Sequence, residues 1–135
     1  MAVLGRLVGR VAIITGAARG IGRSIALRYA GEGCSLALSD LDLAGVQRTA
    51  QECEAAGQAH AIRTATFKTD VTKRDDVQAM VDGTVEQLGR LDIVVNNAGI
   101  FNNSAFELMS DQSWYSMIDV NLNSVFLVSQ IAVRH

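Results

Sequence analysis

Apolar and polar positions follow two periodicities along this chain. Four short runs are rich in β-branched and small apolar residues and have the length of buried strands. They cover 10–15, 35–39, 64–69 and 92–97. Four longer segments carry apolar residues at the spacing of a helix face, and three of them are closed by a glycine. They cover 21–32, 43–57, 77–89 and 111–135.

Strand and helix therefore follow each other four times. This order predicts an α/β fold with parallel strands, right-handed crossovers and helices on both faces of the sheet. In such a sheet, ligands bind beyond the carboxyl ends of the strands. The candidate site is formed by the loops after the four predicted strands, at 16–22, 40–42, 70–72 and 97–103.

The first and last helices carry the most specific packing expectations. In the first helix, Ile21, Ile25, Ala26 and Tyr29 form the predicted apolar stripe. The last helix begins after Ser110, a plausible N-cap, and is apolar nearly all round, so we expect it to be buried on more than one side. One broad face carries Trp114, Ile118, Leu122, Val125 and Phe126, and other faces carry Met117, Leu127 and Ile131.

The loop after the first strand contains three glycines. Gly16 permits a tight turn, while Gly20 and Gly22 let backbone come close to a ligand and let the helix pack close to the sheet. The following helix directs free N–H groups at this loop, which suits a pyrophosphate. The alternative is a glycine-rich connection without a ligand. The spacing G-x-x-x-G-x-G departs from the common dinucleotide fingerprint, and no Gly-Lys-Ser/Thr follows, which excludes a P-loop.

The second strand ends at Asp40, eighteen residues after Gly22. An acidic residue at about this distance is placed to accept hydrogen bonds from the ribose hydroxyls of an adenosine. The alternative is a carboxylate that caps the next helix, a role that Asp42 could fill equally well. A glycine loop together with an acidic residue at the end of the second strand supports the dinucleotide interpretation more strongly than either feature does alone.

Composition narrows the function classes. The 135 residues are 49% hydrophobic and 19% charged, as in one folded domain over 1–135. A net charge of −2 gives no reason to expect nucleic acid or an anionic membrane as a partner, and there is no apolar run of membrane-spanning length. Arg6 and Arg10 interrupt the apolar pieces of the N-terminus, so we expect no secretory signal and a cytoplasmic protein. Cys34 and Cys53 have no metal-site spacing and are expected to be reduced and buried.

Four ordered motifs resemble the short-chain dehydrogenase/reductase family. They are "TGAARGIG" at 15–22, "DV" at 70–71, "NNAG" at 96–99 and "DVNLNSVFLVSQ" at 119–130. The resemblance covers nearly the whole chain and implies a Rossmann-type, doubly wound parallel sheet. It also implies that the chain ends after the fourth strand–helix unit of that fold, so that 1–135 would be an incomplete NAD-binding domain.

The resemblance implies a cofactor-binding set of residues. It consists of Gly16, Arg19, Gly20, Ile21, Gly22, Asp40, Leu41, Asp70, Val71, Asn97, Ala98 and Gly99. The glycine loop would line the pyrophosphate, and Asp40 would hold the ribose. Asp70 and Val71 would flank the adenine, and Asn97–Gly99 would pass beneath the cofactor. Asn121 matches the helix asparagine that helps relay protons in this family. From the residues alone, Asn97–Gly99 could equally be a capped strand end and Asn121 a structural polar residue.

The choice between NAD and NADP is a question of charge. Asp40 would repel a 2′-phosphate, and Leu41 offers no compensating charge. Arg19 acts in the opposite sense, because a basic residue in the glycine loop can reach a phosphate. A carboxylate facing a dianion should outweigh one flexible surface arginine, so we expect NAD rather than NADP.

The family's chemistry requires a serine and a tyrosine with a lysine four residues later. Tyr29 and Tyr115 are followed at that distance by Gly33 and Asp119 instead. The resemblance therefore implies an NAD-dependent oxidoreductase that moves hydride between nicotinamide and an alcohol or ketone carbon, with this chain as a fragment inactive alone. The alternatives are a catalytically inactive nucleotide-binding or interaction module and, less favoured, a flavin-binding domain.

The resemblance also implies a partner for the last helix. In this family the helix matching 111–135 packs on the sheet and on the same helix of a second subunit, so we expect a homo-oligomer. An unpaired fourth strand would add to the tendency to associate. We therefore expect the isolated chain to be weakly stable, oligomeric or aggregating.

Overall fold

The computed structural model describes residues 5–135. Its four strands are all parallel and lie in the order β3-β2-β1-β4. They are β1 (Val11–Thr15), β2 (Ser35–Asp40), β3 (Thr64–Lys68) and β4 (Ile93–Val95). The four predicted strands are confirmed, although β4 is shorter than the predicted run. The chain reverses its direction of winding between β1 and β4, which places a switch point at their carboxyl ends.

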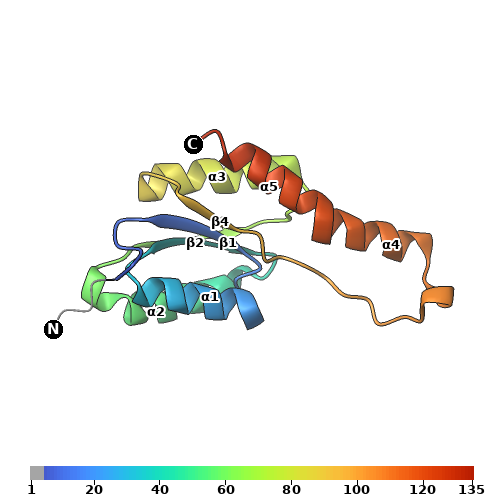
Figure 1. The fold of residues 1–135 in the computed structure, drawn as a ribbon, viewed down its shortest axis with the longest axis horizontal. Coiled ribbons are helices and arrows are strands. Elements are labelled where there is room, and N and C mark those ends of the chain that lie inside the picture. The colour runs from blue at the N-terminus through green and yellow to red at the C-terminus, as the bar shows by residue number, and fades with distance from the viewer. Residues whose placement is uncertain (1–4) are drawn as a thin grey trace.

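Helices cover both faces of this sheet. The main ones are α1 (Gly20–Gly31), α2 (Leu43–Ala56), α3 (Arg74–Leu88), α4 (Asp111–Ile118) and α5 (Ser124–Ala132). Short turns are η1 (Gln58–His60), η2 (Phe106–Leu108) and the π-helical η3 (Asp119–Asn123). α1 and α2 lie on one face, and α3 and α5 lie on the other (Figure 1). The doubly wound α/β prediction is confirmed.

The two layers of helices enclose two separate cores. Alternate side chains of β1 point to opposite faces, so that Ala12 and Ile14 pack with α1 and α2, whereas Val11 and Ile13 pack with α3 and α5. All five residues of β1 are buried, as expected for a central parallel strand. β4 is only half-buried, and within residues 5–135 it pairs with β1 alone.

The predicted stripe of α1 is wrong at one position. Ile21 is 73% exposed, whereas Ala26 is buried as predicted, together with Gly22 and Ala30. Ile21 lies in the first turn of α1, directly after the loop that follows β1, and its side chain does not pack on the core. Small residues on the inner side then allow close approach of the helix to β1 and β2.

The last helix also differs from its prediction. It is not one α-helix over 111–135, because the π-helical turn η3 separates α4 from α5, and α5 ends at Ala132. Ser110 caps α4, as predicted, by accepting a hydrogen bond from the Ser113 amide at 3.2 Å. Among residues 5–135 no helix is both long and apolar enough to cross a membrane.

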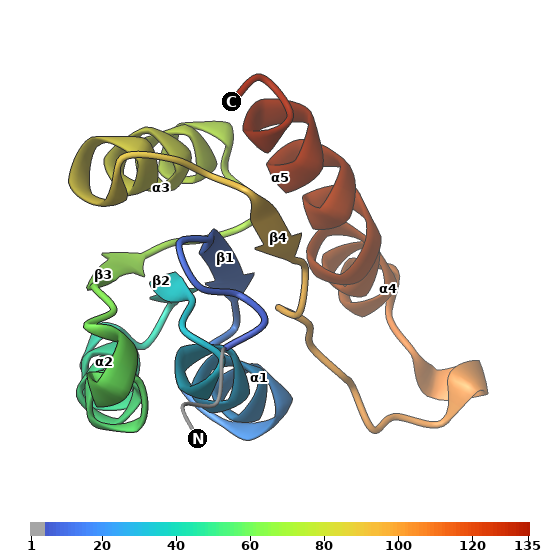
Figure 2. The same cartoon turned by 60° about the vertical axis from the view of Figure 1, so that its left-hand side comes forward.

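The face of this helix that packs on the protein is not the broad face identified from the sequence. The buried positions are Ser124, Leu127, Val128, Ile131 and Ala132. The exposed positions include Trp114, Leu122, Val125 and Phe126. A π turn adds a residue to the helical period, which rotates α5 relative to α4. α4 and the loop before it extend away from the sheet (Figure 2).

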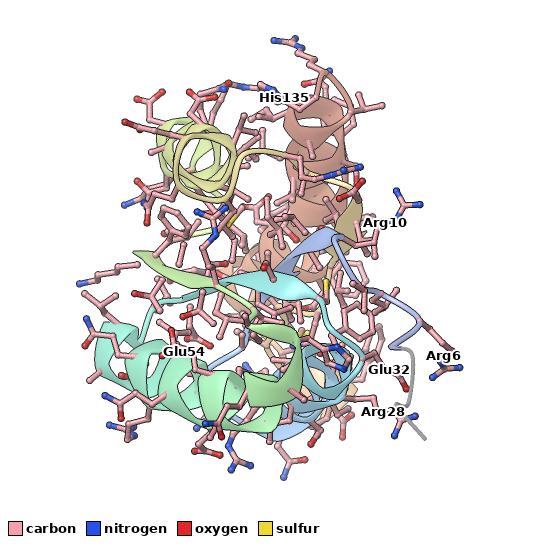
Figure 3. All side chains as sticks on the ribbon, turned by 90° about the vertical axis from the view of Figure 1, so that its left-hand side faces the viewer. Arg6, Arg10, Arg28, Glu32, Glu54 and His135 are labelled. Carbon is pink, nitrogen blue, oxygen red and sulfur yellow. The ribbon has the colours of Figure 1, made fainter. Side chains whose placement is uncertain are left out.

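Charged groups fix the end of the molecule opposite the candidate loops. Glu32, after α1, lies between Arg6 and Arg28, with N–O distances of 3.0 and 2.6 Å (Figure 3). Asp92 accepts hydrogen bonds from Arg90, from Arg10 and, at 2.9 Å, from the Val11 amide. The Arg90 side chain is the largest cause that lowers the pKa of Asp92 to about 2, with the Val11 amide and Arg10 adding to it.

This lowered pKa makes a prediction about acid stability. A carboxyl group whose folded pKa lies below its unfolded value stabilises the fold above about pH 4 and loses that contribution as the pH falls toward 2. We expect Asp92→Asn to lower the melting temperature by about 5 °C at pH 7. The difference from the parent protein should shrink between pH 4 and pH 2. A difference that stays constant over this range would contradict the assigned role of the Asp92 charge.

Candidate functional site

A hollow of about 520 Å³ lies at the carboxyl ends of the four strands. It is lined by residues of the loops after β1, β2, β3 and β4, which meet at the switch point. The lining residues are Gly16, Arg19, Gly20, Ile21, Ser39, Asp40, Leu41, Thr69, Asp70, Val71, Asn97, Ala98, Gly99, Ile100 and Val120. Of the predicted cofactor-binding set, only Gly22 does not line this hollow.

The three glycines of the first loop have different structural reasons. A Cβ on Gly22 would lie 2.2 Å from the Gly16 carbonyl oxygen, and one on Gly16 would lie 2.9 Å from the Ala98 Cα. These two glycines therefore allow α1 and the loop after β4 to pack on the glycine loop. Gly20 has a φ of +59°, and within residues 5–135 a Cβ there would meet no atom within 4 Å apart from its chain neighbours and the backbone of α1. Its missing side chain leaves open space at the start of α1.

The loop after β4 is locked to the glycine loop. The Thr15 hydroxyl accepts hydrogen bonds from the Asn97 and Ala98 amides at 3.1 and 3.0 Å. The Asn97 carboxamide donates to the Thr15 and Gly16 carbonyls at 3.0 and 3.1 Å. The Asn97 side chain therefore holds two loops together, and the backbone of Asn97–Gly99 lines the hollow.

Asp40 faces the hollow from the end of β2. Its Oδ2 accepts a hydrogen bond from the Ala18 amide at 3.2 Å, and its Oδ1 accepts one from the Asp42 amide at 3.1 Å. The cap of α2 is Asp42, which accepts from the Gly45 amide at 2.9 Å. The capping alternative considered for Asp40 is thus fulfilled by Asp42, and the Asp40 carboxylate is left at the wall of the hollow.

The loop after β3 supplies a second carboxylate. Asp70 Oδ1 accepts from the Thr72 hydroxyl at 2.6 Å and from the Thr72 amide at 3.0 Å, and Lys73 lies 3.8 Å from Oδ2. The hydrogen bond from the Thr72 side chain is the largest cause that lowers the pKa of Asp70. Asp70 is therefore an ionised acceptor at neutral pH. Val71, beside it, is buried and lines the same wall.

The predicted cofactor-binding set omits four lining residues, Ser39, Thr69, Ile100 and Val120, although Ile100 falls within the predicted loop 97–103. Ser39 and Thr69 immediately precede the two carboxylates, so their positions at strand ends could have identified them. Both hydroxyl groups are buried and have no hydrogen-bond partner within residues 5–135. Buried hydroxyls without a partner are uncommon in folded proteins, and both of these residues line the hollow.

Asn121 lies in the π-helical turn and does not itself line the hollow. Its Oδ1 accepts from the Ile100 amide, and its Nδ2 donates to the Ile100 carbonyl, both at 2.8 Å. This two-bond contact fixes the loop that follows Gly99. The contact joins η3 to the loop after β4, a pairing that no spacing in the sequence indicates.

Other polar and titratable groups give no further chemistry here. Within residues 5–135, no three His, Cys, Asp or Glu side chains are grouped so that they could hold a metal ion. Cys34 and Cys53 are free and buried, and burial is the main cause that raises their thiol pKa values to about 11 and about 12. Both are neutral, unreactive thiols at physiological pH.

Comparisons with known proteins agree with this geometry. A family described as short chain dehydrogenase matches residues 10–135. The chain is 41% identical over 130 residues to 3beta-hydroxysteroid dehydrogenase 2 of Eggerthella lenta. The matched segment covers 96% of this chain and 48% of the relative.

Solved structures show the same likeness. A short-chain type dehydrogenase/reductase from Mycobacterium marinum is 36% identical with a TM-score of 0.89, over 97% of this chain and 51% of that one. Carveol dehydrogenase from Mycobacterium avium, solved in complex with NAD, is 35% identical with a TM-score of 0.86. This match covers 97% of this chain and 50% of the carveol dehydrogenase chain. The chain thus spans about half the length of the relatives it matches. Its fold, its motifs and its match over 10–135 show that it belongs to the short-chain dehydrogenase/reductase family.

Proposed function

We propose that residues 1–135 bind NAD as the cofactor-binding part of an oxidoreductase. The reaction is hydride transfer between the nicotinamide and an alcohol or ketone carbon of a small molecule. The observation that carries this proposal is the convergence of the glycine loop, Asp40 and Asp70 on one hollow of about 520 Å³. The carveol dehydrogenase structure with NAD supports a cofactor of this kind.

The residues present fit a dinucleotide. The open space at Gly20, at the N-terminus of α1, can take a pyrophosphate, because free amide groups and the helix dipole favour an anion there. Asp40 would accept hydrogen bonds from the adenosine ribose. Asp70 and Val71 would hold the adenine, and Ser39 and Thr69, whose hydroxyls have no partner among the described residues, line the same hollow.

NAD rather than NADP is proposed on electrostatic grounds. The Asp40 carboxylate lies at the wall where the ribose would sit, and a 2′-phosphate there would face a like charge. Arg19 also lines the hollow and would favour a phosphate. We give Asp40 the greater weight, because both of its oxygens are held by backbone amides, whereas the Arg19 side chain is exposed.

The bound nicotinamide would supply or accept the hydride. Asn97–Gly99 would support its ring from below, and Asn121 would hold that loop in place through Ile100. We propose that Asn121 also takes part in the proton relay, as its match to the family motif implies. Neither Tyr29 nor Tyr115 has a lysine four residues later, so we propose that residues 1–135 bind cofactor without catalysing turnover by themselves.

That last observation also supports a second candidate, a nucleotide-binding or interaction module without turnover. An NADH-binding isotherm combined with a hydride-transfer assay over a panel of alcohols separates the two, using the protein as its gene encodes it. Binding with turnover supports the oxidoreductase, and binding without turnover supports the module.

We propose that the protein is located in the cytoplasm, where the free thiols of Cys34 and Cys53 would stay reduced.

The exposed apolar face of α4, η3 and α5 leads to a prediction about assembly. Leu122 and Phe126 are 61% and 62% exposed on it, and we propose that a second copy of the chain covers this face. We expect a Leu122→Glu/Phe126→Glu variant to raise the dimer dissociation constant more than about tenfold in size-exclusion chromatography with light scattering. Val8→Glu, at an exposed apolar residue outside these helices, is the control. A variant that stays as oligomeric as the parent would contradict the proposal.

A further inference from the structure

The Asp40 carboxylate connects three parts of the site. It is the last residue of β2, its Oδ2 accepts from Ala18 in the glycine loop, and its Oδ1 accepts from Asp42 at the start of α2. Hydrogen bonds to a charged acceptor are stronger than those between neutral groups. Asp40 is therefore bound to the glycine loop before any ligand arrives.

Other contacts also restrain the glycine loop near Ala18, because the Ala18 side chain packs against the core and the Asn97 carboxamide donates to the Gly16 carbonyl. Ala18 lies between Gly16 and Gly20, both of which have positive φ values. The preceding amide, Ala17 N–H, donates to the Ser39 carbonyl at 3.0 Å. On the other side, the Thr49 hydroxyl reaches the Ala18 carbonyl only at 3.5 Å. The Asp40 side chain thus extends the contact between β2 and the loop by one residue toward the start of α1.

We propose that Asp40 is a positioning residue for the phosphate-binding loop, in addition to facing the ribose. It sets the orientation of the Ala18 peptide, and through it the turn that leads to Gly20 and the free amides of α1. This inference rests on the proposed function for the identity of the ligand. Its consequence is that Asp40 contributes to binding of the pyrophosphate even when no ribose hydroxyl is present.

Electrostatics alone gives the opposite expectation, and this makes the inference testable. A carboxylate near a pyrophosphate repels it, so removal of the Asp40 charge should leave the affinity for a phosphate ligand unchanged or increased. Loss of the hydrogen bond between Asp40 and the Ala18 amide should instead decrease the affinity for the phosphate ligand. The direction of the change therefore distinguishes a positioning role from a purely ribose-binding role.

The probe is 2′,3′-dideoxyadenosine 5′-diphosphate, which keeps the adenine and the pyrophosphate but lacks both ribose hydroxyls. Its Kd is measured by calorimetry for the parent protein and for the Asp40→Ala, Asp40→Asn and Asp42→Asn variants, each made in the whole protein that the gene encodes. We expect Asp40→Ala to bind about tenfold more weakly, and Asp40→Asn, which keeps one acceptor oxygen, to be intermediate. Asp42→Asn also loses one charge but leaves Ala18 untouched, so its Kd should stay within about twofold. Unchanged or tighter binding by Asp40→Ala would overturn the inference.

A second measurement needs no ligand and separates this inference from the proposed function. Amide hydrogen exchange at Ala18 should be at least about fivefold faster in Asp40→Ala than in the parent protein, with no change in Asp42→Asn. Equal exchange rates would overturn the positioning role, whatever the protein binds. A parent protein that shows the expected exchange but binds no NADH would contradict the proposed function and leave the loop contact established.

Discussion

A Gly20→Val variant should keep its fold and lose most of its affinity for NADH. Within residues 5–135, a Cβ on Gly20 meets no atom within 4 Å beyond its own helix and chain neighbours, so the branched side chain would stand in the hollow at the N-terminus of α1. That is the space in which we place the pyrophosphate. We expect the Kd for NADH to rise at least about a hundredfold, which corresponds to about 2.7 kcal/mol.

The backbone at Gly20 adds a separate cost that has to be subtracted. Its φ of +59° is unfavourable for a branched residue, by about 1–2 kcal/mol, so the melting temperature should fall by several degrees. Gly89→Val is the matched control, because Gly89 has a φ of +87° and does not line the hollow, and its Cβ position has no other described residue within 4 Å besides its chain neighbours. It should show a similar thermal shift and an unchanged Kd. Equal losses of affinity in both variants would mean that Gly20 acts through the backbone alone.

An Asp40→Arg variant should change the cofactor preference from NAD toward NADP. The substitution replaces a like charge at the ribose wall with a cation that can pair with the 2′-phosphate, beside Arg19. We expect the ratio of the NADPH Kd to the NADH Kd to fall by about 10²-fold or more. Because Asp40 also holds Ala18, both cofactors should lose the same contribution from the phosphate-binding loop, and this loss cancels in the ratio.

The comparison needs both cofactors measured on the same preparations. Arg19→Gln in the parent protein is the companion variant, and it should weaken NADPH binding more than NADH binding. A parent protein that binds NADPH at least as tightly as NADH would show that Arg19 outweighs Asp40. The charge argument for NAD would then be wrong.

Much of the fold could be predicted because the sequence signals are local. The β-branched runs and the helical stripes depend on the periodicity of each element, and parallel order follows from their alternation. The site could be predicted for the same reason, since the carboxyl ends of parallel strands must meet at one edge. The loops that carry Asp40 and Asp70 are therefore expected beside the glycine loop, although they are far apart in the chain, whereas the role of Asp70 comes from the family resemblance.

The features that could not be predicted depend on contacts between elements. The last helix is apolar on nearly every side, so its pattern could not tell that Leu127, Val128 and Ile131 would face the protein while Phe126 would not. The π turn over 119–123 has no periodic signature of its own. Nothing in the spacing of Asn121 indicates its two hydrogen bonds to Ile100.

The glycines illustrate the same limit at the level of single atoms. The sequence assigned one role jointly to Gly20 and Gly22, because both simply lack a side chain. The structure separates them, since Gly22 has the Gly16 carbonyl 2.2 Å from its Cβ position while Gly20 faces open space. Tight packing and room for a ligand require the same residue type, and only the neighbouring atoms distinguish the two.

The central claim is that this hollow binds NAD, and a direct titration tests it. Calorimetry with NADH and NADPH should be performed on the protein as its gene encodes it, with Gly20→Val as the site control. We expect one NADH per chain, bound at least about tenfold more tightly than NADPH, and little binding to Gly20→Val. A folded parent protein that shows no saturable NADH binding would contradict this account. Equal NADH affinity of the parent protein and the Gly20→Val variant would also contradict it.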